Sequence, residues 1–291
     1  MNHERNIWVV GGDLRQAKLA QLLSQDGHTV HTYALDQVRD LPGPFPQVSL
    51  NRIGLADCVI LPLPVCQGGS TLLNAPLSAA DYPLEEILDR LSPGQFLCGG
   101  RVGEPIHALA QSRDLTIRDY FAREELAIAN AVPTAEGAVQ LAMEHLPITI
   151  HGARVLVLGF GRVGRLTAQR FHALGARVSV AARKCDQLAW AQAMGYGAER
   201  LEELESWLCG YDLIINTVPA RVLGRKELEQ AREDCLILDL ASKPGGVDLG
   251  AAGELGLTVV WALSLPGKVA PVTAGEAIKN TIYHMLAELG E

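Results

Sequence analysis

Residues 155–164, VLVLGFGRVG, constrain the fold more than any other part of this sequence. An apolar run leads into Gly159, Gly161 and Gly164, and helical spacing follows over residues 162–175. A G-x-G-x-x-G between a strand and a helix is typical of a βαβ unit that binds a dinucleotide. Glycines at this spacing cost backbone entropy, so we interpret them as a ligand-binding turn and not as a plain one.

Strand-like and helix-like segments alternate on both sides of this turn, which predicts parallel sheets covered by helices. The expected strands before the turn are IWVVGG, HTVHTYAL, DCVILPL, QFLCGG and TIRDYF, and those from the turn onward are RVLVLG, RVSVAA, DLIINTV, CLILDLA and LTVVWAL. Residues 41–54 and 67–83 are expected to be loops. We therefore predict an α/β chain with two doubly wound parallel-sheet domains, the second a Rossmann dinucleotide-binding domain.

The segment 123–146 is helical in character and is expected to connect the two domains. Pro133 interrupts it, so we expect a break or kink there and a new helix just after it. The expected domains are 1–146, a flavodoxin- or Rossmann-like domain for substrate or subunit contacts, and 147–273, the dinucleotide-binding domain. Residues 274–291 are expected to form a helix that packs back on the first domain.

The composition argues against several classes of function. The chain has 291 residues and a formal net charge of −8, and it has no basic run interleaved with aromatic residues, which argues against nucleic-acid binding. No apolar run approaches the ~20 residues of a membrane span, and we expect no secretory signal. The six cysteines form no C-x-x-C pair, so we expect reduced, buried thiols and a cytoplasmic protein. No H-E-x-x-H or comparable spacing occurs, so we expect no metal site.

Each glycine of the turn has an expected role. Gly159 permits the tight turn, Gly161 lets the backbone approach a pyrophosphate, and Gly164 lets the helix pack closely on the strand. The first turn of the helix offers free N–H groups and a partial positive charge to the phosphates.

The end of the next strand indicates which dinucleotide is bound. An NAD site usually carries an Asp or Glu about 20 residues after the glycines, where it binds the ribose 2′-hydroxyl. Here RVSVAARKCD places Arg183 and Lys184 at that point, with no carboxylate before Asp186. A guanidinium binds a 2′-phosphate bidentately, whereas a carboxylate repels it. The sequence therefore predicts NADP.

Two further loops follow strands of the same domain. INTVPA ends one strand with Asn216, Thr217 and Pro219, and LDLASKPGGVD ends the next. Ligands of open α/β sheets bind at the carboxyl ends of strands, so we expect both loops to flank the coenzyme, the second beside the nicotinamide.

Six motifs together resemble one known family. They are GGDLRQ, AIANAVPTAEGAVQLA, ITIHGARVLVLGFGRVG, INTVPA, LDLASKPGG and LPGKVAPVTAGEAI. In order and spacing they are similar to the dipicolinate synthase A-subunit family of spore-forming bacteria, over nearly the whole chain. The resemblance implies an NADP-dependent oxidation of dihydro- or tetrahydrodipicolinate to dipicolinate in the cytoplasm of the mother cell during sporulation. It also implies that the partner is the flavoprotein-like B subunit of dipicolinate synthase; we further expect homo-oligomers.

The resemblance also implies which residues contact the coenzyme. They are Gly159, Gly161, Arg162, Val163, Gly164, Arg183 and Lys184, with Thr217, Val218 and Pro219 nearby. The family usually has Arg in ASRPGG where this chain has Lys243.

A cyclic dicarboxylate substrate requires local positive charge in an acidic protein. Arg15 and Arg101 each follow a glycine pair at the end of an expected strand, so both could face a cleft. With Lys243 they form a candidate dicarboxylate clamp. Glu136, expected at the start of a helix, is the candidate general base, or it only complements the helix dipole.

Two alternatives remain open at this level. One is an NADP-dependent reductase of a 2-oxo acid, a 2-hydroxy acid or an imino acid. The other is a pyridine-nucleotide-binding sensor or assembly subunit without turnover of its own, which the weak case for a catalytic base favours.

Overall fold

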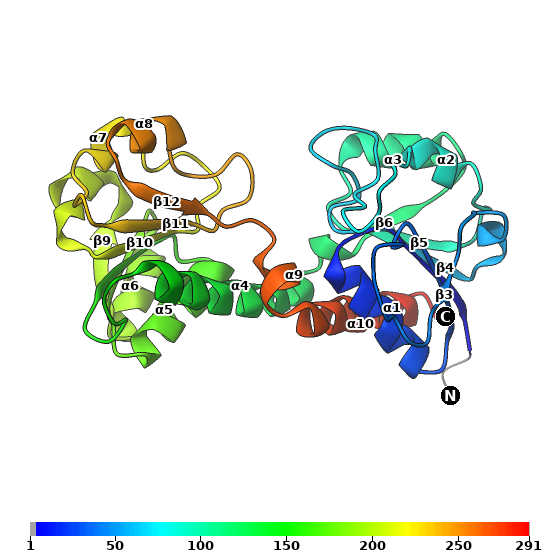
Figure 1. Ribbon diagram of the computed structural model, residues 1–291. Coiled ribbons are helices and arrows are strands. Elements are labelled where there is room, and N and C mark those ends of the chain that lie inside the picture. Colours follow the sequence, from blue (N-terminus) through cyan, green and yellow to red (C-terminus); the bar gives the residue numbers. More distant parts are fainter. Residues whose placement is uncertain (1–3, 291) are drawn as a thin grey trace. The chain divides into compact units, whose positions relative to one another are not determined.

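The structure of the chain is a computed structural model that describes residues 4–290 (Figure 1). The described chain forms two compact units. One unit runs to Asn130 and resumes at Ala270, and the other spans Ala131–Val269. Each unit is built around its own parallel six-stranded sheet, which confirms the predicted α/β class with two doubly wound sheets.

The first sheet has the strand order β3-β2-β1-β4-β5-β6. Its strands are β1 (Asn6–Val10), β2 (Thr29–Tyr33), β3 (Phe45–Pro46), β4 (Cys58–Ile60), β5 (Phe96–Gly99) and β6 (Ile117–Asp119). Its helices are α1 (Leu14–Gln25), α2 (Leu84–Leu88), α3 (Glu104–Gln111) and α10 (Pro271–Glu288), with short 3₁₀ turns η1 (Ile53–Leu55) and η2 (Tyr120–Ala122). The sequence missed β3, which lies inside a segment expected to be loop.

The second sheet has the order β12-β11-β10-β7-β8-β9, the strand arrangement of a dinucleotide-binding Rossmann sheet. Its strands are β7 (Arg154–Leu158), β8 (Arg177–Ala182), β9 (Gly197–Arg200), β10 (Leu213–Asn216), β11 (Leu236–Asp239) and β12 (Thr258–Trp261). Its helices are α5 (Arg162–Ala173), α6 (Cys185–Ala193), α7 (Arg225–Leu228), α8 (Leu249–Glu254) and α9 (Leu265–Val269), with η3 (Leu201–Ser206) and η4 (Leu208–Gly210). The sequence missed β9, the edge strand.

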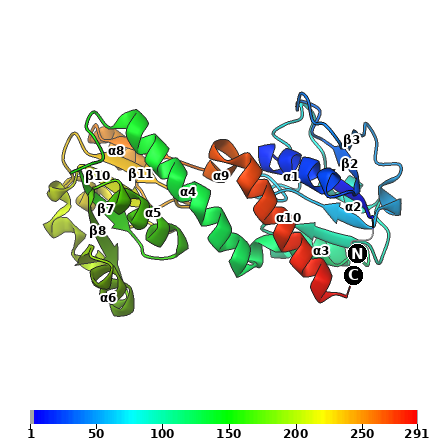
Figure 2. The same ribbon diagram turned by 90° about the horizontal axis from the view of Figure 1, so that it is seen from below.

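Helix α4 (Glu124–His145) runs through Pro133 as a single helix (Figure 2). The expectation of a break at Pro133, with a new helix after it, is therefore wrong. Proline removes one backbone N–H, but the alanine-rich sequence favours helix and Ala138 and Ala142 pack against the second sheet, which stabilises the continuous helix.

The last helix, α10, packs along α1 in the first unit, where both views show the two helices side by side (Figures 1 and 2). Gly275 makes this close approach possible, because a Cβ there would lie 2.9 Å from the carbonyl oxygen of Arg15. Ile278 and Ile282 of α10 share a buried cluster with Leu19 and Leu23 of α1. The two units divide at Asn130 and Ala270, whereas the sequence placed functional boundaries at 146/147 and 273/274; those boundaries stay a prediction.

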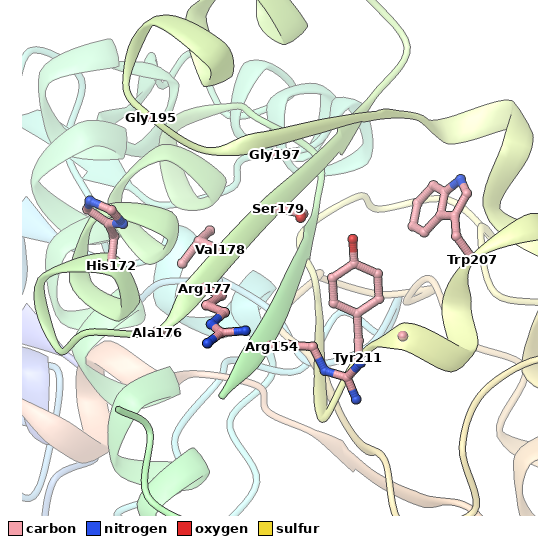
Figure 3. A pocket seen from close by; sticks show the side chains of 11 residues that line it. Arg154, His172, Ala176, Arg177, Val178, Ser179, Gly195, Gly197, Trp207 and Tyr211 are labelled. Carbon is pink, nitrogen blue, oxygen red and sulfur yellow. The ribbon is translucent and has the colours of Figure 1, made fainter. Parts of the chain in front are cut away.

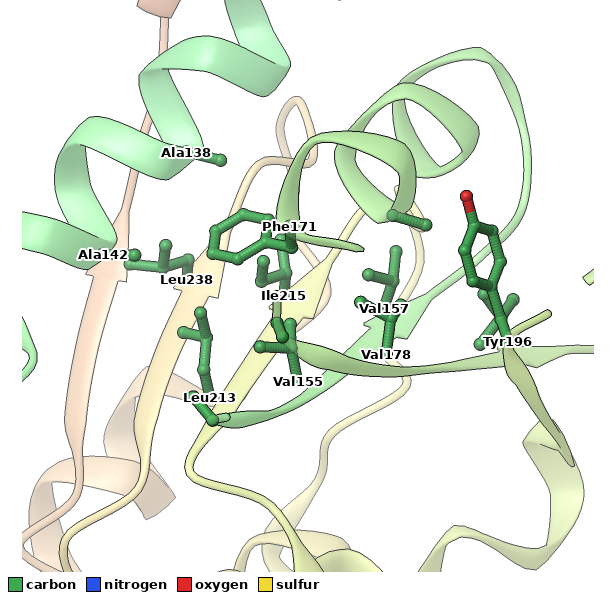
Figure 4. Packing of buried hydrophobic residues seen from close by; sticks show 14 of the residues in the cluster. Ala138, Ala142, Val155, Val157, Phe171, Val178, Tyr196, Leu213, Ile215 and Leu238 are labelled. Atoms are coloured by element: carbon green, nitrogen blue, oxygen red, sulfur yellow. The ribbon is translucent and has the colours of Figure 1, made fainter. Parts of the chain in front are cut away.

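One face of the second sheet is buried under α4 and α5 (Figure 4). Val155 and Val157 of β7, with Ile215 of β10, point toward Phe171 of α5. The opposite face carries a separate buried cluster that includes Leu156, Leu158 and Ile214. Burial on both faces explains why these strands appear in the sequence as continuous apolar runs.

Candidate functional site

The candidate site is the turn between β7 and α5 at the carboxyl edge of the second sheet. Gly159 has a φ of +91°, a conformation that glycine adopts without strain. A Cβ on Gly164 would lie 2.1 Å from the carbonyl oxygen of Gly159, so only glycine fits there. Gly159 and Gly164 therefore occupy positions that require glycine, as the sequence predicted.

Gly161 has a different environment. It is the N-cap of α5, no side chain caps the helix there, and a Cβ on it would meet nothing within 4 Å. The N-cap position of α5 thus borders open space. This is the arrangement that an anionic pyrophosphate requires, so the turn fits a dinucleotide.

Strand β10, which pairs with β7, ends beside the glycine turn and contributes residues to the same edge of the sheet. Thr217 donates its hydroxyl to the carbonyl oxygen of Leu158 at 2.8 Å, and a Cβ on Gly159 would lie 2.7 Å from that hydroxyl oxygen. Val218 and Pro219 follow it, with Pro219 exposed. Predicted coenzyme contacts from two strands, β7 and β10, therefore lie together.

Arg183 and Lys184 directly follow β8, the strand next to β7. Both side chains are exposed, and Lys184 is the N-cap of α6. Arg162 and Val163 form the first turn of α5. The residues predicted to contact the coenzyme thus share one edge of one sheet.

A buried carboxylate fixes the loop that carries Lys243. Asp239, 1% exposed at the end of β11, accepts hydrogen bonds from the Asn216 side chain at 2.7 Å, from the Ala241 N–H at 3.0 Å and from the Gly246 N–H at 2.8 Å. Asn216 also binds the backbone of Val218. One carboxylate therefore holds the two loops that the sequence expected to flank the coenzyme.

Asp239 was missed by reasoning from the sequence. The available signal was an acidic residue closing the apolar run CLILDLA, where a buried charge requires partners. Lys243 lies on the held loop, is exposed, and is joined to Pro244 by a cis peptide bond.

Arg15, which was expected to face a cleft, is buried inside the first unit. Its side chain pairs with Asp13 at 2.8 Å and donates to the carbonyl oxygen of Leu63 at 2.7 Å. Arg101 is exposed, has a φ of +57° and lies over the ring of Phe121. Of the predicted cationic clamp, Arg101 and Lys243 are exposed and Arg15 is engaged by its own unit.

Glu136 is not at the start of a helix, because α4 begins at Glu124 and continues past it. It is exposed and lies 3.9 Å from Arg170 of α5. Arg170 is eight residues after Arg162, about 12 Å along the helix axis from the glycine turn. The role of Glu136 as general base stays a prediction that this placement does not strengthen.

The cysteines are free thiols. Cys58, Cys98 and Cys235 are buried as expected, but Cys185 and Cys209 are exposed, because they lie on a helix and a 3₁₀ turn at the surface. Burial raises the pKa of Cys235 to about 12, so this thiol is protonated at neutral pH and is no nucleophile.

A separate open pocket lies at the other edge of the second sheet (Figure 3). Arg154 and Arg177, the first residues of β7 and β8, line it with Trp207 and Tyr211. The glycine turn follows the last residue of β7, so this pocket is not the dinucleotide site. Within residues 4–290, no group of three or more His, Cys, Asp or Glu side chains could hold a metal ion, and no helix is long and apolar enough to cross a membrane.

Comparisons with known proteins agree with this geometry. Residues 6–121 match the family model of the N-terminal domain of the dipicolinate synthase A subunit. Residues 122–241 match that of the D-isomer specific 2-hydroxyacid dehydrogenase, NAD binding domain. The second unit therefore contains a domain of the nicotinamide-dinucleotide-binding dehydrogenase class.

Relatives match over the whole length. The chain is 33% identical to the A subunit of dipicolinate synthase from Bacillus subtilis (strain 168) over 285 residues, 97% of this chain and 96% of that protein. The crystal structure of the A subunit of dipicolinate synthase from Bacillus halodurans is 32% identical, with a TM-score of 0.86 and coverage of 97% and 98% of the two chains. The transhydrogenase of Sinorhizobium meliloti, 15% identical with a TM-score of 0.72 over 98% and 94%, shares the fold.

Proposed function

This chain belongs to the dipicolinate synthase A-subunit family, and from that premise we propose that it oxidises dihydro- or tetrahydrodipicolinate to dipicolinate with NADP⁺. The observation that carries the proposal is the open glycine turn at Gly161 together with the exposed Arg183 directly after the adjacent strand β8. We propose that it works with the flavoprotein-like B subunit of dipicolinate synthase, and as a homo-oligomer, in the cytoplasm of the mother cell during sporulation.

The residues of the second unit bind and orient the coenzyme. The first turn of α5 binds the pyrophosphate through backbone N–H groups, and Arg183 and Lys184 bind the 2′-phosphate. Thr217, Val218 and Pro219 border the adenosine side. The bound coenzyme supplies the hydride acceptor; catalysis by the protein then consists mainly of orientation and charge matching.

The substrate's two carboxylates require cations. Lys243 is exposed on the loop that Asp239 holds, so it is the candidate partner for a carboxylate in the second unit. Arg101 is the exposed candidate of the first unit. In one oxidation the dihydro ring loses a hydride from a ring carbon and a proton from a neighbouring ring atom, giving the aromatic pyridine; a tetrahydro ring needs two such oxidations.

A reductase of 2-oxo, 2-hydroxy or imino acids is a second candidate, because residues 122–241 match a 2-hydroxyacid dehydrogenase domain. One assay separates the candidates. The purified chain is incubated with freshly made tetrahydrodipicolinate and NADP⁺, with and without the flavoprotein-like B subunit from the same organism, and the ultraviolet absorbance of the pyridine product is followed. Product supports the proposal. No product with both subunits present, together with NADPH oxidation by a panel of 2-oxo and imino acids, overturns it.

The coenzyme choice has its own test. We expect NADP(H) to bind at least about tenfold tighter than NAD(H), since a charge-assisted phosphate contact is worth about 1.5–3 kcal/mol. Arg183→Asp reverses the preference, while Arg177→Asp, an exposed arginine at the other end of β8, leaves it unchanged. Equal affinities of the unchanged protein for both coenzymes would remove NADP from the proposal.

A further inference from the structure

We propose that Arg200 is a second cation of the 2′-phosphate site, beside Arg183. The inference rests on the proposed binding of NADP and adds a specificity-determining residue from a different strand. It starts from β9, the edge strand that the sequence did not reveal.

The register of the sheet places the two arginines together. Strand β9 is parallel to β8, and Arg200 is the register partner of Ala182, the residue before Arg183. Neighbouring strands lie about 4.8 Å apart, so the Cα atoms of Arg200 and Ala182 are adjacent. Both strands end at this point, and their carboxyl ends form the edge of the sheet at which the glycine turn lies.

Arg200 also lies on the appropriate face of the sheet. Ala198, two residues before it, packs against the buried cluster that contains Phe171 of α5. Side chains alternate along a strand, so Arg200 shares the face of Ala198, which is the face covered by α5. The glycine turn leads into α5 on this same face. Glu199 is directed to the opposite face.

The charge of Arg200 is available for a ligand. Its side chain is exposed, and neither Arg200 nor Arg183 forms an ion pair or a side-chain hydrogen bond with a residue in the described part of the chain. Glu202 and Glu203 follow in η3 and Asp186 lies in the first turn of α6, but none of them pairs with either arginine. Two unpaired guanidinium groups at one sheet edge fit a dianionic phosphate monoester, which offers three oxygens to planar donors.

The test measures binding of 2′,5′-ADP, 5′-AMP, NADPH and NADH to the full-length protein by calorimetry. Arg200→Ala is compared with Arg183→Ala and with Arg177→Ala as the matched control. We expect Arg200→Ala to weaken 2′,5′-ADP and NADPH about tenfold and to leave 5′-AMP and NADH unchanged. Circular dichroism and thermal unfolding establish that each variant folds as the parent does.

Each other outcome overturns a defined statement. If Arg200→Ala keeps the parent's affinity for 2′,5′-ADP while Arg183→Ala loses it, the inference is wrong and the proposed NADP site stands. If Arg200→Ala weakens 5′-AMP as much as 2′,5′-ADP, Arg200 contacts the adenosine and not the 2′-phosphate, and the inference is again wrong. If the unchanged protein binds 5′-AMP and 2′,5′-ADP with equal affinity, the proposal that NADP is the coenzyme is wrong.

Discussion

The two sheets of this chain have the same strand order but differ at the turn after their first strand. In the second unit, Gly161 caps α5 and faces open space. In the first unit, Asp13 caps α1, and its carboxylate accepts the Arg15 N–H that an anion would otherwise bind. When the two turns are aligned at their helix caps, Arg15 and Gln16 of the first unit correspond to Val163 and Gly164 of the second.

Residues 73 and 74 of the first unit also occupy the space beside its turn. Gly12 donates its N–H to the carbonyl oxygen of Asn74, and a Cβ on Gly11 would lie 2.6 Å from the side chain of Leu73. The first unit therefore fills with its own side chains the position that the second leaves open. A shared topology gives both units a candidate anion site, and the residues at one helix N-terminus decide whether a ligand can use it.

The largest expected effect is at Asp13. Asp13→Ala removes the cap of α1 and leaves the buried Arg15 without its carboxylate, so we expect a loss of about 3 kcal/mol in the free energy of unfolding, measured with urea. NADPH binding should be unchanged. The control is Asp248→Ala, which removes the N-cap of α8 but leaves behind an exposed ion-pair partner, Arg221, and should cost about 1 kcal/mol. Equal losses in the two variants would show that the Asp13–Arg15 pair adds no stability beyond that of an ordinary helix cap.

Substitutions at two glycines of the β7–α5 turn distinguish an effect on stability from an effect on coenzyme binding. Gly164→Ala places a Cβ against the carbonyl oxygen of Gly159, and we expect it to cost about 1–3 kcal/mol of stability. Gly161→Ala meets no atom of the chain, so its cost should stay below about 1 kcal/mol. NADPH affinity of Gly161→Ala should nevertheless fall at least about tenfold, because the methyl group occupies the place of the pyrophosphate. Undiminished NADPH binding by this variant would contradict an open phosphate site.

The smallest expected effect is a pH dependence in the first unit. Partial burial raises the pKa of Asp26, but hydrogen bonds from Lys279 and Tyr283 of α10 outweigh burial and lower the pKa below its usual value. Stability from this carboxylate is present above the unfolded pKa of about 3.9 and is lost as the pH falls through the lower folded value. We expect Asp26→Asn to cost less than about 1 kcal/mol at pH 7, since the site is partly exposed, and nothing at pH 2. A cost independent of pH in urea unfolding would assign the effect to packing.

The sequence predicts the buried parts of this molecule well. Parallel strands covered on both faces are apolar along their length, so most of the strands and the glycine turn could be placed from the sequence. Strand β9 could not, because GAER contains one hydrophobic residue, Ala198, and so lacks the apolar run of the other strands. The continuity of α4 through Pro133 depends on packing against the sheet, which no local rule includes.

The candidate site likewise has residues that the sequence predicts and residues whose partners it does not predict. Contacts within a few residues, such as the glycines and Arg183, follow from local spacing. The burial of Arg15 depends on Leu63, 48 positions away, and the role of Asp239 depends on Asn216, on a neighbouring strand. Such partners are fixed by strand order and by loop conformation, so a charged residue in the sequence does not show whether it faces solvent or holds its own chain.

The packing of α10 on α1 has a consequence for biosynthesis. The second unit is one continuous stretch of chain, whereas the core of the first unit includes Ile278, Ile282 and Met285, close to the carboxyl terminus. Translation proceeds from the amino terminus, so every residue of the second unit is synthesised before Ile278, Ile282 and Met285 of the first unit. Before α10 is synthesised, the face of α1 that includes Leu19 and Leu23 lacks the packing partners Ile278 and Ile282.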